Sequence, residues 1–317
     1  MTHANGLRGV LALLLVMAVG PTLAQVPTLQ GWTLLMVDDF NGAAGHGPDA
    51  AHWTVDLGHH YAGGPLNWGT QEIESYTADP ANLALDGLGH LAITPLRDAQ
   101  GQWTSGRIES KAVFKPAAGH ILRIEARIQM PGVTGAAALG YWPAFWALGS
   151  SFRTDGAWPG AGEFDVMENV NGLDSVWGIL HCGVYPLGPC GEPNGIGSRV
   201  PCPNTTCYGE FHTYTFEWDR RTYPEELRWS VDGQPANRVS QTMLPEATWT
   251  ALTAQDGYFV LLNVAMGGGF SYIMAGGVPT PTATTEPGHP MVVDYVGVWT
   301  QGKVAGPRDA KTPASQP

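Results

Sequence analysis

The stretch ILRIEARIQM, residues Ile121–Met130, decides the class of fold. Apolar side chains alternate along it with charged or amide side chains. Successive side chains of an extended chain point to opposite faces, so this alternation places one set against a core and the other toward solvent. The stretch therefore predicts a β-strand with one buried face. The apolar set comprises Leu122, Ile124, Ala126, Ile128 and Met130.

The same alternation recurs along the chain. Thr213–Asp219 carries aromatic side chains at every second position, and Leu227–Val231 leads into Asp232-Gly233, a hairpin turn signal. No stretch has the pattern of a long amphipathic helix. Many strands separated by turns, in a chain with 42 Gly and 25 Pro, predict an all-β sandwich. Further strands are expected at Leu35–Phe40, His90–Pro95, Tyr258–Ala265 and Met291–Trp299.

Both ends of the chain are expected to lie outside the sandwich. Residues 1–24 hold one charged side chain, Arg8, then an apolar run and small residues, which is the pattern of a secretory signal. The apolar run is shorter than a membrane span, although a retained N-terminal anchor is the alternative. Residues 302–317 lack apolar periodicity and are expected to be disordered. This leaves 25–301 as a single secreted or periplasmic domain, long enough for one sandwich core.

The charge of the chain limits its partners. The formal net charge is −12, which disfavours nucleic acid and anionic membranes because both are recognised through basic patches. Only 14% of residues are charged, against a norm of about 25%, and 12 are Trp. We expect a monomer that acts on a neutral polymer, with no nucleic-acid or membrane partner.

The four cysteines all lie between Cys182 and Cys207. An even set in an exported chain indicates two disulfides, and three pairings are possible. Cys182–Cys190 with Cys202–Cys207 is the simplest, because it closes two short loops. A four-thiolate zinc site is disfavoured since no CxxC pair is present. The segments 183–206 and 278–290 are predicted to be long loops.

The stretch GEFDVMEN, residues Gly162–Asn169, carries the chemistry. Glu163 and Asp165 share a strand face, whereas Glu168 has the opposite parity. A one-residue bulge between Asp165 and Glu168 would return Glu168 to the acidic face. The two Glu Cα atoms would then lie roughly 13 Å apart, and inclined side chains would reduce the carboxylate separation to about 5–6 Å. An exposed strand edge with three solvated acids is the alternative.

That separation is close to the ~5–5.5 Å of retaining glycosidases, in which one carboxylate attacks and the other serves as acid and then base. Asp165 would lie between the two and orient its neighbour. Close like charges push pKa values apart, which supplies one ionised and one protonated carboxyl group at the same pH.

Aromatic side chains precede the acids. The segment Tyr141–Trp146 reads YWPAFW, and Trp158-Pro159 comes just before Glu163. Trp rings stack on the apolar faces of sugars, so glycan-binding clefts collect them, although core packing explains many single Trp residues. Trp142 and Trp146 have the same parity, and one strand face can carry both.

These segments resemble glycoside hydrolase family 16, the laminarinase-like enzymes. GEFDVMEN resembles the family's ExDxxE signature, and YWPAFWALG (Tyr141–Gly149) is similar to its WPAFWMLG segment. Other segments match in the same order over roughly residues 33–301: SGRIESK (Ser105–Lys111), the WP pair, FHTYTFEW (Phe211–Trp218), LLNVAMGG (Leu261–Gly268) and MVVDYVGVW (Met291–Trp299). The resemblance implies a concanavalin-like β-jelly roll with the glycan across its concave sheet. The ExDxxE spacing is that of the bulged subgroup.

The resemblance also implies roles. Glu163 would be the nucleophile, Glu168 the general acid/base and Asp165 the helper between them. For the substrate-binding residues, it places Trp142, Trp146 and Arg107 at the glycone subsites, His181 on the aglycone side, and Trp158 in the cleft. For single residues such as Arg107 and His181, a structural role is the alternative.

Two departures from the family fall near the cleft. Cys182 stands where laminarinases usually carry a Trp after the His. WGTQEIESYT (Trp68–Thr77) replaces WGNNELQYYT, so that Thr70 and Gln71 stand for two Asn. Both changes leave the linkage specificity open. They do not touch the three acids.

The resemblance implies no cofactor for catalysis but a possible structural Ca²⁺. The matching positions are Asp39, Gly87 through its carbonyl, and Asp294, and oxygen ligands suit this cation. Ordinary turn and strand-edge acids are the alternative explanation for Asp39 and Asp294.

We therefore expect a secreted, retaining endo-β-glucanase acting on β-1,3 glucan, and whether it also cuts mixed 1,3-1,4 glucan is left open by the sequence. A galactan hydrolase or a glucan transglycosylase would share the same acids. A non-catalytic glucan-binding lectin is the hypothesis from another class, and the presence of all three acids disfavours it.

Overall fold

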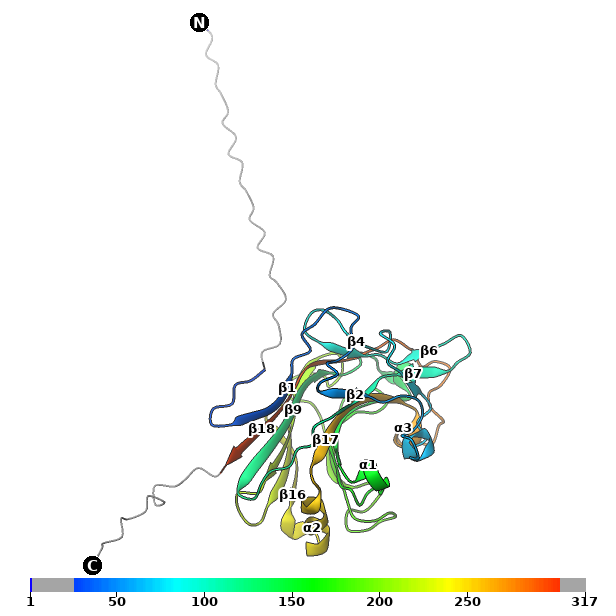
Figure 1. The fold of residues 1–317 in the computed structure, drawn as a ribbon. Helices are drawn as coiled ribbons and strands as arrows, with labels where there is room; N and C mark the ends of the chain where they lie inside the picture. The colour runs from blue at the N-terminus through cyan, green and yellow to red at the C-terminus, as the bar shows by residue number, and fades with distance from the viewer. Residues whose placement is uncertain (2–25, 303–317) are drawn as a thin grey trace, which may run out of the picture.

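The computed structural model describes residues 1 and 26–302 (Figure 1). The expected signal segment and C-terminal tail lie outside this part of the chain, apart from Met1 and Gly302. Within it, none of the helices combines the length and the hydropathy needed to cross a bilayer.

Eight antiparallel strands form the first sheet, sheet I. Their order is β16-β15-β14-β9-β18-β5-β4, with β1 paired to β18. The strands are β1 (Thr33–Asp38), β4 (Leu83–Leu85), β5 (Leu91–Ile93), β9 (His120–Gln129), β14 (Phe211–Asp219), β15 (Glu226–Val231), β16 (Gln234–Ser240) and β18 (Met291–Gly302). The predicted strands that fall in this sheet are confirmed, with ends that differ by a few residues.

Seven antiparallel strands form the second sheet, sheet II, in the order β13-β12-β11-β10-β17-β8-β2. They are β2 (Trp53–Val55), β8 (Arg107–Ser110), β10 (Tyr141–Gly149), β11 (Glu163–Glu168), β12 (Val176–His181), β13 (Ile196–Val200) and β17 (Tyr258–Met266). A small sheet joins β3 (Ser75–Tyr76), β7 (Trp103–Ser105) and β6 (Leu96–Arg97). The helices are short: η1 (Leu66–Gly69), η2 (Gly135–Ala138), α1 (Phe152–Asp155), η3 (Gln241–Met243), α2 (Glu246–Ala254) and α3 (Gly268–Met274).

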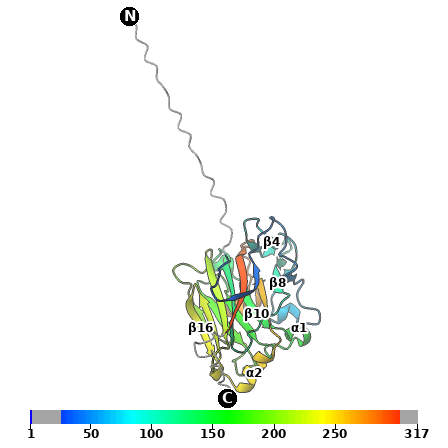
Figure 2. The same ribbon diagram turned by 60° about the vertical axis from the view of Figure 1, so that its left-hand side comes forward.

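Sheets I and II pack face to face and enclose one large apolar core (Figure 1). Phe164 of β11 stacks on Phe216 of β14 at a ring-centroid distance of 4.6 Å, which joins the two sheets at the centre. The predicted sandwich is thus confirmed. In Figure 2, as in Figure 1, α2 lies at the lower end of the sandwich, beyond the strands.

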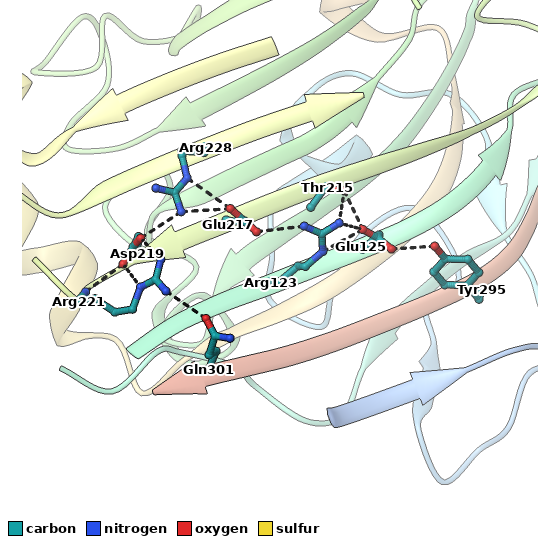
Figure 3. A network of polar contacts seen from close by, with 9 residues as sticks. All are labelled: Arg123, Glu125, Thr215, Glu217, Asp219, Arg221, Arg228, Tyr295 and Gln301. Carbon is teal, nitrogen blue, oxygen red and sulfur yellow. Dashed lines mark hydrogen bonds and ion pairs between the residues drawn. The ribbon is translucent and has the colours of Figure 1, made fainter. Parts of the chain in front are cut away.

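The outer face of sheet I carries the polar side chains of the alternating pattern (Figure 3). Arg123 of β9 donates to Glu125 and, over 3.0 Å, to Glu217 of β14. Tyr295 of β18 donates its hydroxyl to Glu125 over 2.7 Å. Although Glu125 belongs to the polar set, these neighbours bury it to 2% exposure. The outer face of sheet I therefore carries an ordered network of ion pairs and hydrogen bonds.

The predicted loop 183–206 is wrong in part. Ile196–Val200 forms β13, an edge strand that pairs with β12. The two disulfides are Cys182–Cys190 and Cys202–Cys207, which confirms the simplest pairing. The segment 278–290 contains no helix or strand, as expected.

Candidate active site

Strand β11 contains the predicted bulge. Glu168 pairs with Ala144 and Asp165 pairs with Trp146 on β10, so four residues of β11 stand opposite three of β10. The pairing with β12 shifts register between Asp165 and Glu168. Val166 and Met167 both lie in the core, which returns Glu168 to the face of Glu163 and Asp165. This face points away from sheet I.

Strand pairing lines up the site residues across this outer face of sheet II. Glu163 pairs with His181 of β12, and Glu168 pairs with Trp177 of the same strand. On the other side, Ala144 of β10 stands between Glu168 and Asn263 of β17. The acids therefore lie mid-sheet, with His181 and Trp177 to one side and β10, β17 and β8 to the other.

Each acid has defined partners. Trp142 donates its indole N–H to Glu168 Oε1 over 2.8 Å. Oxygen or nitrogen atoms of Glu163, Asp165 and His181 lie within 4.8 Å of one another. Asp165 is 4% exposed, and its Oδ2 lies 3.2 Å from His181 Nε2. Glu163 and Glu168 remain half-buried at the surface of the sheet.

Burial and neighbouring charges shift the pKa values of Glu163, Glu168 and His181 in this cluster. Burial, followed by the negative charge of Asp165, raises the pKa of Glu163 to about 8 and holds the pKa of Glu168 well above its usual range. The His181 charge opposes both shifts. Burial alone lowers the pKa of His181, but hydrogen bonds to Asp165 and Glu192 outweigh burial and hold that pKa well above its usual range. The cluster can therefore hold one ionised and one protonated Glu at one pH.

Trp146 lies over the β17–β8 side of the site. Its indole N–H donates to Asn263 Oδ1 over 2.8 Å, and Asn263 donates to the Tyr76 hydroxyl over 3.0 Å. Trp142 and Trp146 thus share the outer face, as their parity predicts. Both rings keep a half-buried surface that a ligand can contact.

Arg107 is only 3% exposed and lies against the rings of Trp68 and Trp146. Its guanidinium carbon is 4.3 Å from the Trp68 ring centroid and 4.9 Å from that of Trp146. Arg107 Nε pairs with Asp56 over 3.0 Å, and Nη2 donates to the Tyr61 hydroxyl over 2.9 Å. The structure thus shows Arg107 supporting Trp rings, while its direct contact with sugar stays a prediction.

Trp158 stands on the His181 side. Its ring centroid is 5.4 Å from that of His181 and 6.3 Å from that of Tyr185, an exposed residue of the disulfide loop. Trp158 thus lies beside His181, and its contact with substrate stays a prediction. Tyr185 extends the same aromatic surface outward.

The two carboxylates of the predicted calcium site, Asp39 and Asp294, contact other side chains of the protein. Asp294 Oδ2 pairs with Arg127 over 2.5 Å, and Oδ1 lies 3.8 Å from His90 Nε2. Asp39 accepts from the Asn41 amide over 2.7 Å. Neither carboxylate has a buried, orphaned oxygen of the kind a cation would satisfy. Calcium at Asp39, Gly87 and Asp294 stays a prediction that these contacts do not favour.

Sequence reasoning missed Trp177, Asn263 and Glu192. Trp177 shares parity with His181 in Val176–His181, and this alternation was a usable signal. Asn263 follows the apolar Leu261-Leu262 pair, where a buried amide calls for a partner. No sequence pattern pointed to Glu192, because its contact with His181 depends on how the disulfide loop folds back.

Comparison with known proteins agrees with this geometry. The family model for glycosyl hydrolases family 16 matches residues 66–259. The chain is 32% identical to a beta-glucanase of Rhodothermus marinus over 84% of this chain and 85% of that protein. It is 27% identical to a glucan endo-1,3-beta-glucosidase of Cryptopygus antarcticus, over 85% and 92% of the two chains.

Among solved structures, the endo-1,3-beta-glucanase from Streptomyces sioyaensis is 54% identical to this chain. The two superpose with a TM-score of 0.85, covering 88% of this chain and 100% of the other. The endo-beta-1,3-glucanase from Pyrococcus furiosus is 30% identical, with a TM-score of 0.66 over 87% and 96% of the two chains.

Proposed function

The chain belongs to family 16 of the glycosyl hydrolases, and we propose that it is a secreted endo-β-1,3-glucanase that works with retention of anomeric configuration. The observation that carries the proposal is the bulge of β11, which gathers Glu163, Asp165 and Glu168 on one face. The names of the similar proteins support the glucan as substrate. The pattern of residues 1–24 supports secretion.

The proposed reaction has two displacements. The Glu163 carboxylate attacks the anomeric carbon while Glu168 gives its proton to the glycosidic oxygen, so the bond to the leaving sugar breaks. Glu168, now ionised, takes a proton from water, and that water attacks the anomeric carbon and releases Glu163. The raised pKa of Glu168 suits it to the first step, because it must hold a proton before bond cleavage.

The residues on either side of the acids would bind different parts of the glucan chain, the glycone on one side and the aglycone on the other. Trp142 and Trp146 on β10 would stack on the sugars of the glycone side, with Arg107 beneath them. His181 and Trp158 would contact the aglycone side. The neutral character of glucan suits a chain whose net charge is −12.

The deciding experiment is a reducing-sugar assay on laminarin, lichenan, cellulose and agarose. We expect activity on laminarin, weaker activity on lichenan, and none on agarose. Glu163→Gln should abolish hydrolysis while laminarin binding persists, and Glu226→Gln on the opposite sheet serves as the matched control. Activity on agarose alone would favour a galactan hydrolase, and binding without any hydrolysis would favour a lectin.

The stereochemistry is tested separately. Proton NMR of the first product of laminarin hydrolysis should show the β-anomer. With Glu163→Ala, added azide should restore bond cleavage and yield an α-glycosyl azide, because azide then attacks from the vacated side. An α-anomer as the first product of the unmodified enzyme would contradict the retaining mechanism.

A further inference from the structure

Glu192 is a fully buried carboxylate to which the proposed reaction gives no role; its exposure is 0%. It lies in the loop between β12 and β13, two positions after Cys190, whose disulfide to Cys182 closes the loop. The backbone of Glu192 is fixed as well, since it exchanges two hydrogen bonds with Leu187, at 2.8 and 2.6 Å. A buried carboxylate is costly unless its oxygens are satisfied.

Both carboxylate oxygens of Glu192 contact the segment His181-Cys182, at the end of β12. Oε1 accepts from the Cys182 backbone N–H over 2.8 Å, and Oε2 lies 2.6 Å from His181 Nδ1. The other ring nitrogen, Nε2, faces Asp165 Oδ2 at 3.2 Å. Ionised carboxylates only accept hydrogen bonds, so Nδ1 donates to Glu192. A proton on Nε2 makes its 3.2 Å contact with Asp165 attractive, whereas a lone pair there would face the carboxylate oxygen. The arrangement fits the imidazolium form of His181.

The groups around His181 come from three elements. Asp165 and Glu163 face it from β11, Glu192 faces it from the loop, and the Trp158 ring covers it. Arg199 of β13 is occupied elsewhere, because it donates to Ser175 Oγ over 2.7 Å. Three carboxylates thus surround one imidazole, and its charge lowers the pKa of both Glu163 and Glu168.

The space around the ring is also set by sequence. Gly195 has a φ of +65°, and a Cβ there would lie 3.0 Å from His181 Cε1 and 2.4 Å from Ile179 Cγ2. A side chain at this position would therefore push on the ring and on its strand. The loop fits closely enough to hold one ring orientation.

We propose that Glu192 is a positioning residue that keeps His181 positively charged and directed at Asp165, so that Glu163 can ionise and attack. The inference rests on the proposed function of Glu163 as the nucleophile. Without Glu192, the ring loses the partner that requires a proton on Nδ1. The positive charge that offsets Asp165 beside Glu163 would then be lost.

The test compares pH profiles of kcat/KM on laminarin for the unmodified enzyme, Glu192→Gln, His181→Gln and the double variant. Gln at 192 can still accept from the Cys182 N–H but carries no charge. We expect the acidic limb, which reports ionisation of the nucleophile, to move to higher pH by about one unit in His181→Gln. The shift should have the same direction but be smaller in Glu192→Gln, because that variant also removes a negative charge that raises the pKa of Glu163. The double variant should show no larger shift than His181→Gln alone, because both act on one charge.

Glu210→Gln is the matched control, since this exposed acid precedes β14 and makes no contact with the site. It should leave the limb in place. A Glu192→Gln enzyme that folds and has an unshifted acidic limb overturns the inference while the glucanase function stands. An unmodified enzyme inactive on every glucan would instead overturn the proposed function.

A second measurement does not depend on enzyme activity, and it does not require the Glu192→Gln variant to fold. The Cε1 proton of His181, assigned by its loss in His181→Gln, is followed by NMR in the unmodified protein from pH 5 to 9. We expect the imidazolium shift to persist well above the ordinary pKa of a histidine. Titration near the ordinary value of about 6.5 would overturn the inference.

Discussion

Trp229 of β15 donates its indole N–H to the main-chain carbonyl of Asp165 over 2.8 Å, across the interface between the two sheets. The bond meets β11 at its bulge, where the regular pairing with β12 is interrupted. Buried backbone carbonyls need hydrogen-bond donors, and the indole N–H supplies one where the ladder is irregular. Sheet I thereby stabilises the backbone that presents Glu168 on sheet II.

The first prediction concerns this bond. Trp229→Phe keeps an aromatic ring in the core but removes the indole donor to the buried Asp165 carbonyl, which should cost about 1–3 kcal/mol in the free energy of unfolding. Because the bulge positions Glu168, kcat should fall as well. Urea unfolding and laminarin kinetics measure the two effects.

The control for this variant is Trp218→Phe. Trp218 is also buried, but its N–H faces Glu225 at 3.3 Å, away from the acids. It should lower stability and leave kcat nearly unchanged. Equal kcat in the unmodified enzyme and Trp229→Phe would show that the bulge does not depend on this bond.

The second prediction separates the two Trp residues of β10. An N–H donated to a carboxylate favours its ionised form, so the Trp142 bond lowers the pKa of Glu168. Trp142→Phe should raise this pKa further. Glu168 must be protonated to act as acid, so the alkaline limb of kcat/KM should move to higher pH.

Trp146→Phe tests the specificity of that effect. The Trp146 N–H binds Asn263 and not an acid of the site, so its loss should weaken substrate binding without moving the alkaline limb. If the limb moves equally in both variants, the Trp142 hydrogen bond does not set the pKa of Glu168.

Local alternation carried most of the fold prediction. Ile121–Met130 and Thr213–Asp219 could be read as strands because one face of each packs in the core. Ile196–Val200 was missed because it is an edge strand in which Gly, Ser and Arg interrupt the apolar residues, so pairing with β12 and not its own pattern makes it a strand.

The site was predictable where the chemistry lies within one segment. The parity conflict between Asp165 and Glu168 was enough to predict the bulge. The burial of Arg107 was not predictable, because its counter-charge, Asp56, lies far away in sequence. The Glu192 contact with His181 depends on loop geometry, and a single sequence does not encode that in any periodic signal.

The third prediction concerns the charge network on sheet I (Figure 3). Burial alone would raise the pKa of Asp219, but hydrogen bonds from Arg221 and then Arg228 outweigh burial and lower the pKa to about 2. The unfolded value is higher, so this stabilisation is complete above pH ~4 and is lost as pH falls toward 2.

Asp219→Asn should therefore lower the free energy of unfolding by roughly 1 kcal/mol at pH 7, because the pair is partly exposed. The difference from the unmodified protein should shrink between pH 4 and pH 2. Glu226→Gln should cost less, since its partner Arg238 lies in solvent. Thermal unfolding across this range measures both, and a difference independent of pH would contradict the ion-pair explanation.

The fourth prediction concerns Glu74, which is fully buried. Burial, followed by the negative charge of Glu72, holds the pKa of Glu74 well above its usual range. The folded state thus binds a proton that the unfolded state releases as pH rises above about 4.5, so folding stability falls with rising pH. The slope from one such group reaches about 1.4 kcal/mol per pH unit.

Glu74→Gln removes this titration. Its oxygen can still accept from the Met266 N–H, which binds Glu74 Oε2 at 2.7 Å. We expect equal melting temperatures at pH 4 and a higher one for the variant at pH 8. Glu72→Gln should instead destabilise at both values, because Glu72 accepts from Tyr76 over 2.8 Å and from Thr70 over 2.6 Å. A gap between Glu74→Gln and the unmodified protein that stays constant with pH would show that Glu74 is ionised in the fold.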